Sequence, residues 1–116
     1  MRWWKWLVIA ALAFGGWQLV QHRRTPDVST EELTQLASTV RPGDVLIYTT
    51  TDCQYCAQAK AWMNQYGFAY TECDAQVRAD CARELQALGM GVPYLIVRGH
   101  HMKDGFDSDE FVAALR

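Results

Sequence analysis

The fold is decided by one stretch of the chain, Asp44-Val-Leu-Ile-Tyr-Thr-Thr-Thr-Asp-Cys-Gln-Tyr-Cys56. Its first half is a short run of β-branched and apolar side chains, which is typical of a buried strand. Thr51 and Asp52 then open a turn. From Cys53 onward, small and apolar side chains recur at helical spacing until Gly67 ends the pattern. The stretch therefore predicts a strand, a turn and a helix, with a Cys-x-x-Cys pair at the helix start.

The Cys53-x-x-Cys56 pair lies where a protein can activate a thiol. Unpaired amide groups and the positive end of the helix dipole stabilise an anion at a helix start, so we expect the thiolate of Cys53 to form at a lower pH than that of a free thiol. Cys56 follows one helical turn later, close enough for a disulfide. The pattern predicts dithiol–disulfide exchange, in which Cys53 attacks a substrate disulfide and Cys56 resolves the mixed disulfide.

Zinc binding is the main alternative for such a pair. A zinc site built from four thiolates wants a second Cys-x-x-Cys pair. The two remaining cysteines, Cys73 and Cys81, are eight positions apart and fit that spacing poorly. The adjacent His100 and His101 are interpreted as solvated side chains of a hairpin. Redox chemistry is therefore favoured, and no metal ligands are predicted.

Further strands and helices are predicted from apolar periodicity and turn residues. A capping box that begins at Ser29 starts a short helix over about residues 30–39, before Pro42-Gly43. The elements expected after the first strand and helix are a strand at 68–73, a helix at 79–88, a strand at 94–97, a short fourth strand after Gly99, and a helix at 109–115 capped by Ser108. The order predicts an α/β fold with a four-stranded mixed sheet flanked by helices.

Three motifs are similar to those of a known family: Tyr48-Thr-Thr-Thr-Asp-Cys-Gln-Tyr-Cys56, Gly91-Val-Pro-Tyr-Leu-Ile-Val97 and Gly99-His-His-Met-Lys-Asp-Gly-Phe-Asp107. Together they resemble the glutaredoxin family of the thioredoxin superfamily over about residues 44–115. The resemblance implies a thioredoxin-like, glutaredoxin-type fold and thiol–disulfide oxidoreductase activity.

The resemblance also implies residues that bind substrate. It implies that the Val92–Pro93 peptide bond is cis and faces the first cysteine, with the Val92 backbone pairing to an incoming peptide or to glutathione. Asp107 and Ser108 lie where the family's contacts to the α-amino group of glutathione would be, and Tyr55 is expected to border the site. Glutathione is then a candidate co-substrate, and no cofactor is expected.

The chain departs from the family pattern at three places. Glutaredoxins usually carry Lys where this chain has Thr50, Pro where it has Gln54, and Gly-Gly where it has Asp104-Gly105. The missing Lys would have met a glutathione carboxylate. Asp52 adds a negative charge beside the nucleophile, which opposes thiolate formation. These departures favour protein thiols and disulfides over glutathione as substrates.

Cys73 and Cys81 have two interpretations. Cys73 ends the predicted second strand and Cys81 lies near the start of the following helix, so the two can face each other across the loop. They could form a second redox pair that exchanges with the first. The preferred interpretation is a structural disulfide, worth about 2–3 kcal/mol for a short loop. A lasting bridge of this kind belongs in an oxidising compartment.

The N-terminus, residues 1–24, is predicted to be a membrane anchor or uncleaved signal. Its charge-free stretch is 15 residues from Trp6 to Val20, and counting from Trp3, which includes Lys5, gives 18. These lengths are close to the roughly 17–20 residues that a transmembrane helix needs. A cleaved signal peptide ending at Ala11-Leu-Ala13 and a buried or amphipathic helix are the alternatives. The apolar run before that cleavage site is, however, shorter than the usual 7–15 or so residues.

Charges on both sides of the anchor suggest its orientation. Arg2, Lys5 and the amino terminus precede the span and Arg23 and Arg24 follow it, which by the positive-inside rule favours a domain on the periplasmic or another extracytoplasmic side. Three segments are predicted: the anchor, a linker with a short helix at 25–43, and a glutaredoxin-like domain at 44–116.

The rest of the chain is acidic. All 13 Asp and Glu lie beyond residue 24, together with seven of the 11 Lys and Arg. Such a domain repels phosphate backbones, so nucleic acid is excluded as a partner. The expected partners are the membrane and protein thiols or glutathione, with the domain a monomer. Two other functions stay open: a metal or iron–sulfur binding module, and a non-catalytic membrane-tethered interaction domain.

Overall fold

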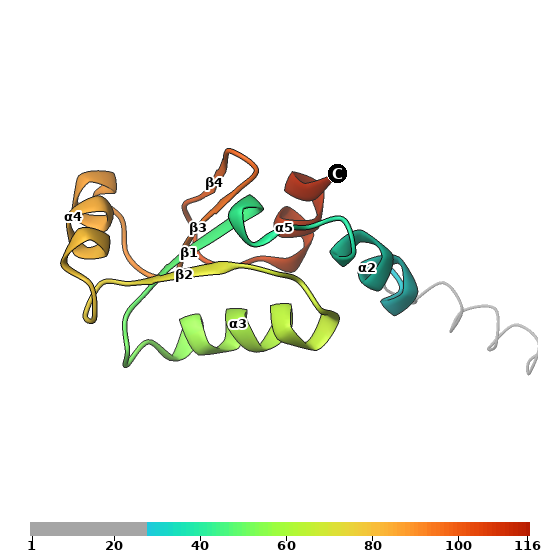
Figure 1. Ribbon diagram of the computed structural model, residues 1–116, viewed down its shortest axis with the longest axis horizontal. Coiled ribbons are helices and arrows are strands. Elements are labelled where there is room, and N and C mark those ends of the chain that lie inside the picture. Colours follow the sequence, from blue (N-terminus) through green and yellow to red (C-terminus); the bar gives the residue numbers. More distant parts are fainter. Residues whose placement is uncertain (1–27) are drawn as a thin grey trace, which may run out of the picture.

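A four-stranded mixed sheet forms the centre of the computed structural model, which describes residues 28–116 (Figure 1). The strands lie in the order β2-β1-β3-β4. β1 runs parallel to β2 and antiparallel to β3, and β3 pairs antiparallel with β4. Their bounds are Val45–Thr49 for β1, Thr71–Asp74 for β2, Tyr94–Val97 for β3 and His100–Met102 for β4. The predicted mixed sheet is confirmed, including its short fourth strand.

Helices cover both faces of this sheet. α2 (Thr30–Ala37), α3 (Gln54–Tyr66) and α5 (Ser108–Leu115) bury residues in a large apolar cluster on one face, whereas α4 (Ala79–Leu88) packs a smaller cluster on the other. A short 3-10 turn, η1 (Pro42–Asp44), leads into β1. This is the predicted α/β arrangement of helices flanking a sheet.

The central strand β1 is covered on both faces. Val45 and Ile47 are fully buried in the cluster that includes α3 and α5, whereas Tyr48 packs in the cluster under α4. The alternation follows from the strand's period of two, which sends neighbouring side chains to opposite faces. A strand buried on both sides has no polar face, which explains why it is a nearly continuous apolar run in the sequence.

The predicted membrane span, residues 1–24, lies outside the described residues. From Val28 to Arg116, no helix is both long enough and apolar enough to cross a bilayer. α2 comes from the segment at 25–43, and it packs Leu33 and Ala37 into the same cluster as the sheet. Part of that segment therefore shares the core of the domain that follows it.

Arg98 joins several chain segments at the end of the sheet where β1 begins. Its φ of 46° is left-handed, and with Gly99 it makes the tight turn into β4. The Arg98 amide donates to the Asp44 carbonyl at 2.8 Å. Its guanidinium donates to the carbonyls of Leu115 at 2.6 Å and Thr39 at 3.1 Å. The ends of α2 and α5 are thus held beside η1.

Three predicted boundaries differ from the structure. The second strand begins at Thr71 rather than residue 68, because Phe68 instead stacks on Trp62 in the core, with ring centroids 5.5 Å apart. The first predicted helix ends at Ala37, two residues early. The last helix is capped by Asp107 rather than Ser108: its carboxylate accepts from the amides two and three positions later, at 2.8 and 3.1 Å.

A second disulfide, Cys73–Cys81, lies at the centre of the α4 cluster. Its Cα atoms are 5.4 Å apart, and the two residues are 8% and 0% exposed. Beside it, the Tyr48 hydroxyl donates to the Glu84 carboxylate at 2.9 Å. Burial, helped by this hydrogen bond, raises the pKa of Tyr48 to about 12, so the hydroxyl stays a donor at physiological pH. The bridge therefore fastens α4 to β2 at a point where the apolar cluster is small.

Replacing both residues, Cys73→Ala and Cys81→Ala, should lower the free energy of unfolding by about 2–3 kcal/mol, because the loop becomes free in the unfolded chain. Thermal unfolding should show a fall in Tm of roughly 10 °C or more. Gln86→Ala, an exposed change on α4, serves as the control and should leave Tm nearly unchanged. A variant with full stability but no thiol–disulfide exchange would instead identify a redox relay.

Candidate active site

The turn from β1 into α3 places Cys53 at the N-cap of the helix. The residue itself is extended, with φ −84° and ψ 108°, and its carbonyl accepts the first helical hydrogen bond from Ala57 at 3.1 Å. Its Sγ accepts from the backbone N–H of Cys56 at 3.1 Å. The sulfur thus occupies the place of the oxygen in a Ser or Asp cap. Cys53 was expected at the first helical position and lies one residue earlier.

The two cysteines differ in their access to solvent. Cys53 is half-buried, whereas Cys56 is 1% exposed beneath it. Their Cα atoms are 5.2 Å apart, and the pair forms a disulfide. Exchange depends on which sulfur an incoming group can reach. An incoming thiolate or disulfide therefore meets Cys53 first.

The Val92–Pro93 peptide bond is cis, as the resemblance implied. Both residues line a pocket of about 590 Å³ that also includes Tyr55, whose side chain is 71% exposed at the start of α3. Three of the five residues predicted to bind substrate therefore come together. Asp107 and Ser108 are not part of the pocket lining, and Asp107 uses its carboxylate to cap α5.

Several pocket residues were missed by the sequence analysis. Gln58 and Trp62 lie three and seven positions after Tyr55, on one face of α3, so helical spacing could have identified them. Trp62 also packs against Phe106, with ring centroids 5.3 Å apart. Lys103, in the turn before α5, also lines the pocket. The hairpin before Lys103 was predicted, but the position of Lys103 in the same pocket as residues of α3 depends on tertiary packing, which carries no short-range sequence signal.

The charged residues of α3 and β2 form their own pair. Lys60 and Glu72 are joined by a salt bridge of 2.6 Å, and the same carboxylate accepts from the Thr49 hydroxyl at 3.0 Å. The hydrogen bond to Glu72 raises the pKa of Lys60, which keeps the amino group charged and paired. Lys60 is therefore held at Glu72, whereas the Cys53 sulfur accepts its hydrogen bond from the backbone N–H of Cys56.

The two adjacent histidines point to different partners. His100 Nε2 lies 2.9 Å from a carboxylate oxygen of Glu110, and His101 Nδ1 is hydrogen-bonded with the Tyr94 hydroxyl. Both residues are exposed, as the sequence analysis expected, and each also has a polar partner. Within residues 28–116, no group of three or more His, Cys, Asp or Glu side chains is arranged to hold a metal ion.

Solved structures with the same fold include a thioredoxin-like protein and two plant glutaredoxins. A point variant of the thioredoxin-like protein BC3987 is 22% identical, with a TM-score of 0.56 over 62% of this chain and 94% of that one. Buckwheat glutaredoxin, in its complex with glutathione, is 22% identical with a TM-score of 0.51 over 78% of this chain and 93% of that one. Wheat glutaredoxin is 20% identical with a TM-score of 0.50 over 78% and 94%. The structural likeness to these three proteins shows a common fold.

Sequence comparison assigns the family. No protein with a curated description matches the chain. The Glutaredoxin family model matches residues 45–102, which is half of the 116 residues. The matched region contains both disulfides, the cis-proline and the whole four-stranded sheet. The chain belongs to the glutaredoxin family.

Proposed function

We propose that this protein is a dithiol–disulfide oxidoreductase with Cys53 as the attacking thiol and Cys56 as the resolving thiol. The observation that carries the proposal is the position of Cys53, which is only half-buried. Its sulfur caps α3 and accepts a hydrogen bond from the backbone N–H of the buried Cys56. In the reduced protein the same amide and the helix dipole would stabilise a thiolate.

The reaction proceeds in two exchanges. The Cys53 thiolate attacks one sulfur of a substrate disulfide, forming a mixed disulfide and releasing the other substrate sulfur as a thiolate. Cys56 loses its proton to solvent and attacks Cys53 Sγ, which releases the second substrate sulfur and closes the Cys53–Cys56 bond. Two electrons pass from the protein to the substrate, and the reverse sequence oxidises a substrate dithiol.

Extended polypeptides are the proposed principal substrates. In the described residues, the large apolar side chains that are most exposed are Tyr55 at 71%, Val77 at 72% and Met90 at 38%. The three come from the start of α3, the loop after β2 and the loop before β3. Because β1 and β2 are parallel and β3 is antiparallel to them, these segments meet at the end of the sheet that carries Cys53. We propose that these exposed side chains give a bound protein chain apolar contacts near Cys53.

Glutathione mixed disulfides are proposed as secondary substrates. Lys103 lines the same pocket as Tyr55 and offers a positive charge to a carboxylate, although Asp104 beside it offsets part of that charge. Buckwheat glutaredoxin, which shares the fold, is a glutathione complex in its solved structure. The contact to the glutathione α-amino group at Asp107 and Ser108 remains a proposal.

We also propose that residues 1–24 anchor the domain to a membrane, with the domain in an oxidising, extracytoplasmic space. Two observations support this placement. The segment is apolar over nearly the length of a bilayer span, with basic residues at both ends. The Cys73–Cys81 bond closes a short loop that cytosolic thiol buffers would keep open.

Alkylation should separate the two cysteines. In protein whose Cys53–Cys56 bond has been reduced, iodoacetamide near pH 7 should modify Cys53 at least tenfold faster than Cys56, because Cys56 is buried and lies one turn inside the helix. Peptide mapping by mass spectrometry follows each site. Equal rates, or faster modification of Cys56, would contradict the assignment of roles.

Trapping should identify the resolving step. Reduced Cys56→Ser protein should form a mixed disulfide with insulin. This adduct should survive at least tenfold longer than the adduct of the unchanged protein, because no second thiol releases it. Cys53→Ser is the matched control and should give no adduct.

Lys103→Ala should slow reduction of a glutathione mixed disulfide by up to about fivefold and leave insulin reduction unchanged, as expected for one exposed ion pair.

Fractionation should test the placement. The full chain should stay with membranes after carbonate extraction, and a chain beginning at Pro26 should be released. Rapid acid quenching of intact cells, followed by thiol labelling, should leave Cys73 and Cys81 blocked. Four free thiols would contradict the oxidising compartment, and recovery of a mature form that begins at Phe14 would identify a cleaved signal.

A further inference from the structure

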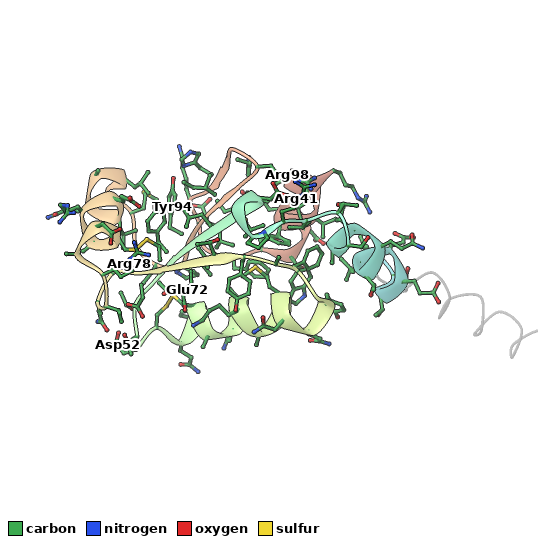
Figure 2. The ribbon with its side chains drawn as sticks, in the orientation of Figure 1. Arg41, Asp52, Glu72, Arg78, Tyr94 and Arg98 are labelled. Atoms are coloured by element: carbon green, nitrogen blue, oxygen red, sulfur yellow. A yellow bond between two sulfur atoms is a disulfide. The ribbon has the colours of Figure 1, made fainter. Side chains whose placement is uncertain are left out.

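The loop between β2 and α4 lies against the turn that leads into Cys53. The Ala75 amide donates to the carbonyl of Thr49, the last residue of β1, at 2.9 Å. The Thr51 hydroxyl donates to the Asp74 carboxylate at 3.1 Å. In Figure 2, Asp52 lies at the outer corner where β1 turns into α3, and Arg78 lies at the base of α4 on the same side of the molecule. The two segments are therefore joined directly.

Gln76 contacts this turn with both ends of its side-chain amide. Its Oε1 accepts from the Thr51 backbone N–H at 3.1 Å, and its Nε2 donates to the Asp52 carboxylate at 3.2 Å. A carboxamide offers an acceptor and a donor side by side, which no carboxylate or ammonium group can do. One side chain thus holds both the backbone and the charge of the turn that precedes Cys53.

The backbone of Gln76 is itself held in place. Its N–H donates to Asp74 Oδ1 at 2.9 Å, and the N–H groups of Val77 and Arg78 donate to the Asp74 carbonyl at 3.2 and 2.9 Å. The Cys73–Cys81 disulfide closes the segment at both ends. Although the side chain is exposed, little backbone freedom remains to be lost when it bonds to the turn.

We propose that Gln76 is a positioning residue for the nucleophile: by holding the Thr51 amide and the Asp52 carboxylate, it keeps the turn in the geometry that lets Cys53 react as a thiolate. The proposal rests on Cys53 being the attacking cysteine. Gln76 touches neither sulfur, and it acts through the two residues that precede Cys53.

The need for such a residue comes from the charge of Asp52. A carboxylate next to a thiolate opposes its formation, and a hydrogen-bond donor on that carboxylate reduces the opposition. The other charged groups around the turn have partners. Asp74 is bonded by Thr51 and by the Gln76 amide, Arg78 pairs with Asp80 at 2.6 Å, and Lys60 pairs with Glu72. Lys103 and Asp104 face the neighbouring pocket.

The test measures the pH dependence of Cys53 alkylation in the full chain, solubilised in detergent, with Cys73–Cys81 left intact. Gln76→Ala should move the midpoint upward by about half a pH unit, which lowers the alkylation rate about threefold at pH values well below the midpoint. Asp52→Asn should move it downward. In the Asp52→Asn background, Gln76→Ala should cause a much smaller shift, because the charge that Gln76 restrains is gone.

Exchanging the two groups tests the hydrogen bond itself. Gln76→Glu can still accept from Thr51 but cannot donate to Asp52, so it should raise the midpoint more than Gln76→Ala does. The double variant Asp52→Asn with Gln76→Glu restores one donor and one carboxylate, and it should return the midpoint toward that of the unchanged protein. Charge alone predicts that the two single shifts add, so a midpoint lower than their sum identifies the restored hydrogen bond.

Gln86→Ala, the same change on the exposed side of α4, is the control and should leave the alkylation profile and Tm unchanged. Thermal unfolding of each variant separates loss of structure from loss of reactivity, and Gln76→Asn, whose shorter side chain cannot bridge both groups, replaces Gln76→Ala if that variant does not fold. An unchanged midpoint, or an equal shift in both Asp52 backgrounds, would overturn the proposal. Because alkylation needs no substrate, its outcome is independent of whether insulin is reduced.

Discussion

The structure depends on the double burial of β1. This strand pairs with β2 on one edge and β3 on the other, and it packs apolar clusters against both faces. Its direction and its end point are therefore fixed from four sides. The chain leaves β1 directly into the turn before Cys53, so the position of the sulfur follows from the most constrained strand in the domain.

The two disulfides lie in segments of the chain that contact each other. One lies at the start of α3, and the other closes the loop whose Asp74 and Gln76 bond to the turn before α3. Gln76 is thereby brought into hydrogen-bond contact with residues that lie 24 and 25 positions before it in the sequence. The chemistry of a helix N-terminus is general, whereas the support given to this particular turn is a property of this chain.

Local signals predicted those parts of the structure that local signals control. The bounds of α4 and β3 match because Gly89 and Pro93 mark them and an apolar run lies between turns. Phe68 was assigned to a strand for its apolar side chain, but its contact with Trp62 decides its place. Asp107 and Ser108 are both good N-cap residues, so the choice between them depended on the geometry of the backbone.

The pocket and the turn contacts could not be predicted in the same way. Lys103 reaches the pocket only because Arg98 and Gly99 adopt left-handed conformations that return the chain across β3. Gln76 reaches Asp52 only once β1 and β2 have paired in register. Both depend on long-range packing, which leaves no pattern at helical or strand spacing.

The position of α2 affects which end of the domain a partner can approach. α2 and the end of α5 are held at the edge where β1 begins, and Cys53 lies where β1 ends (Figure 1). The 13 residues of α3 run between these two ends, a rise of about 20 Å at 1.5 Å per residue. The chain therefore enters the domain at the far pole from its reactive sulfur. Because α2 and Cys53 lie at opposite ends of the domain, a bulky partner can approach Cys53 without contacting α2.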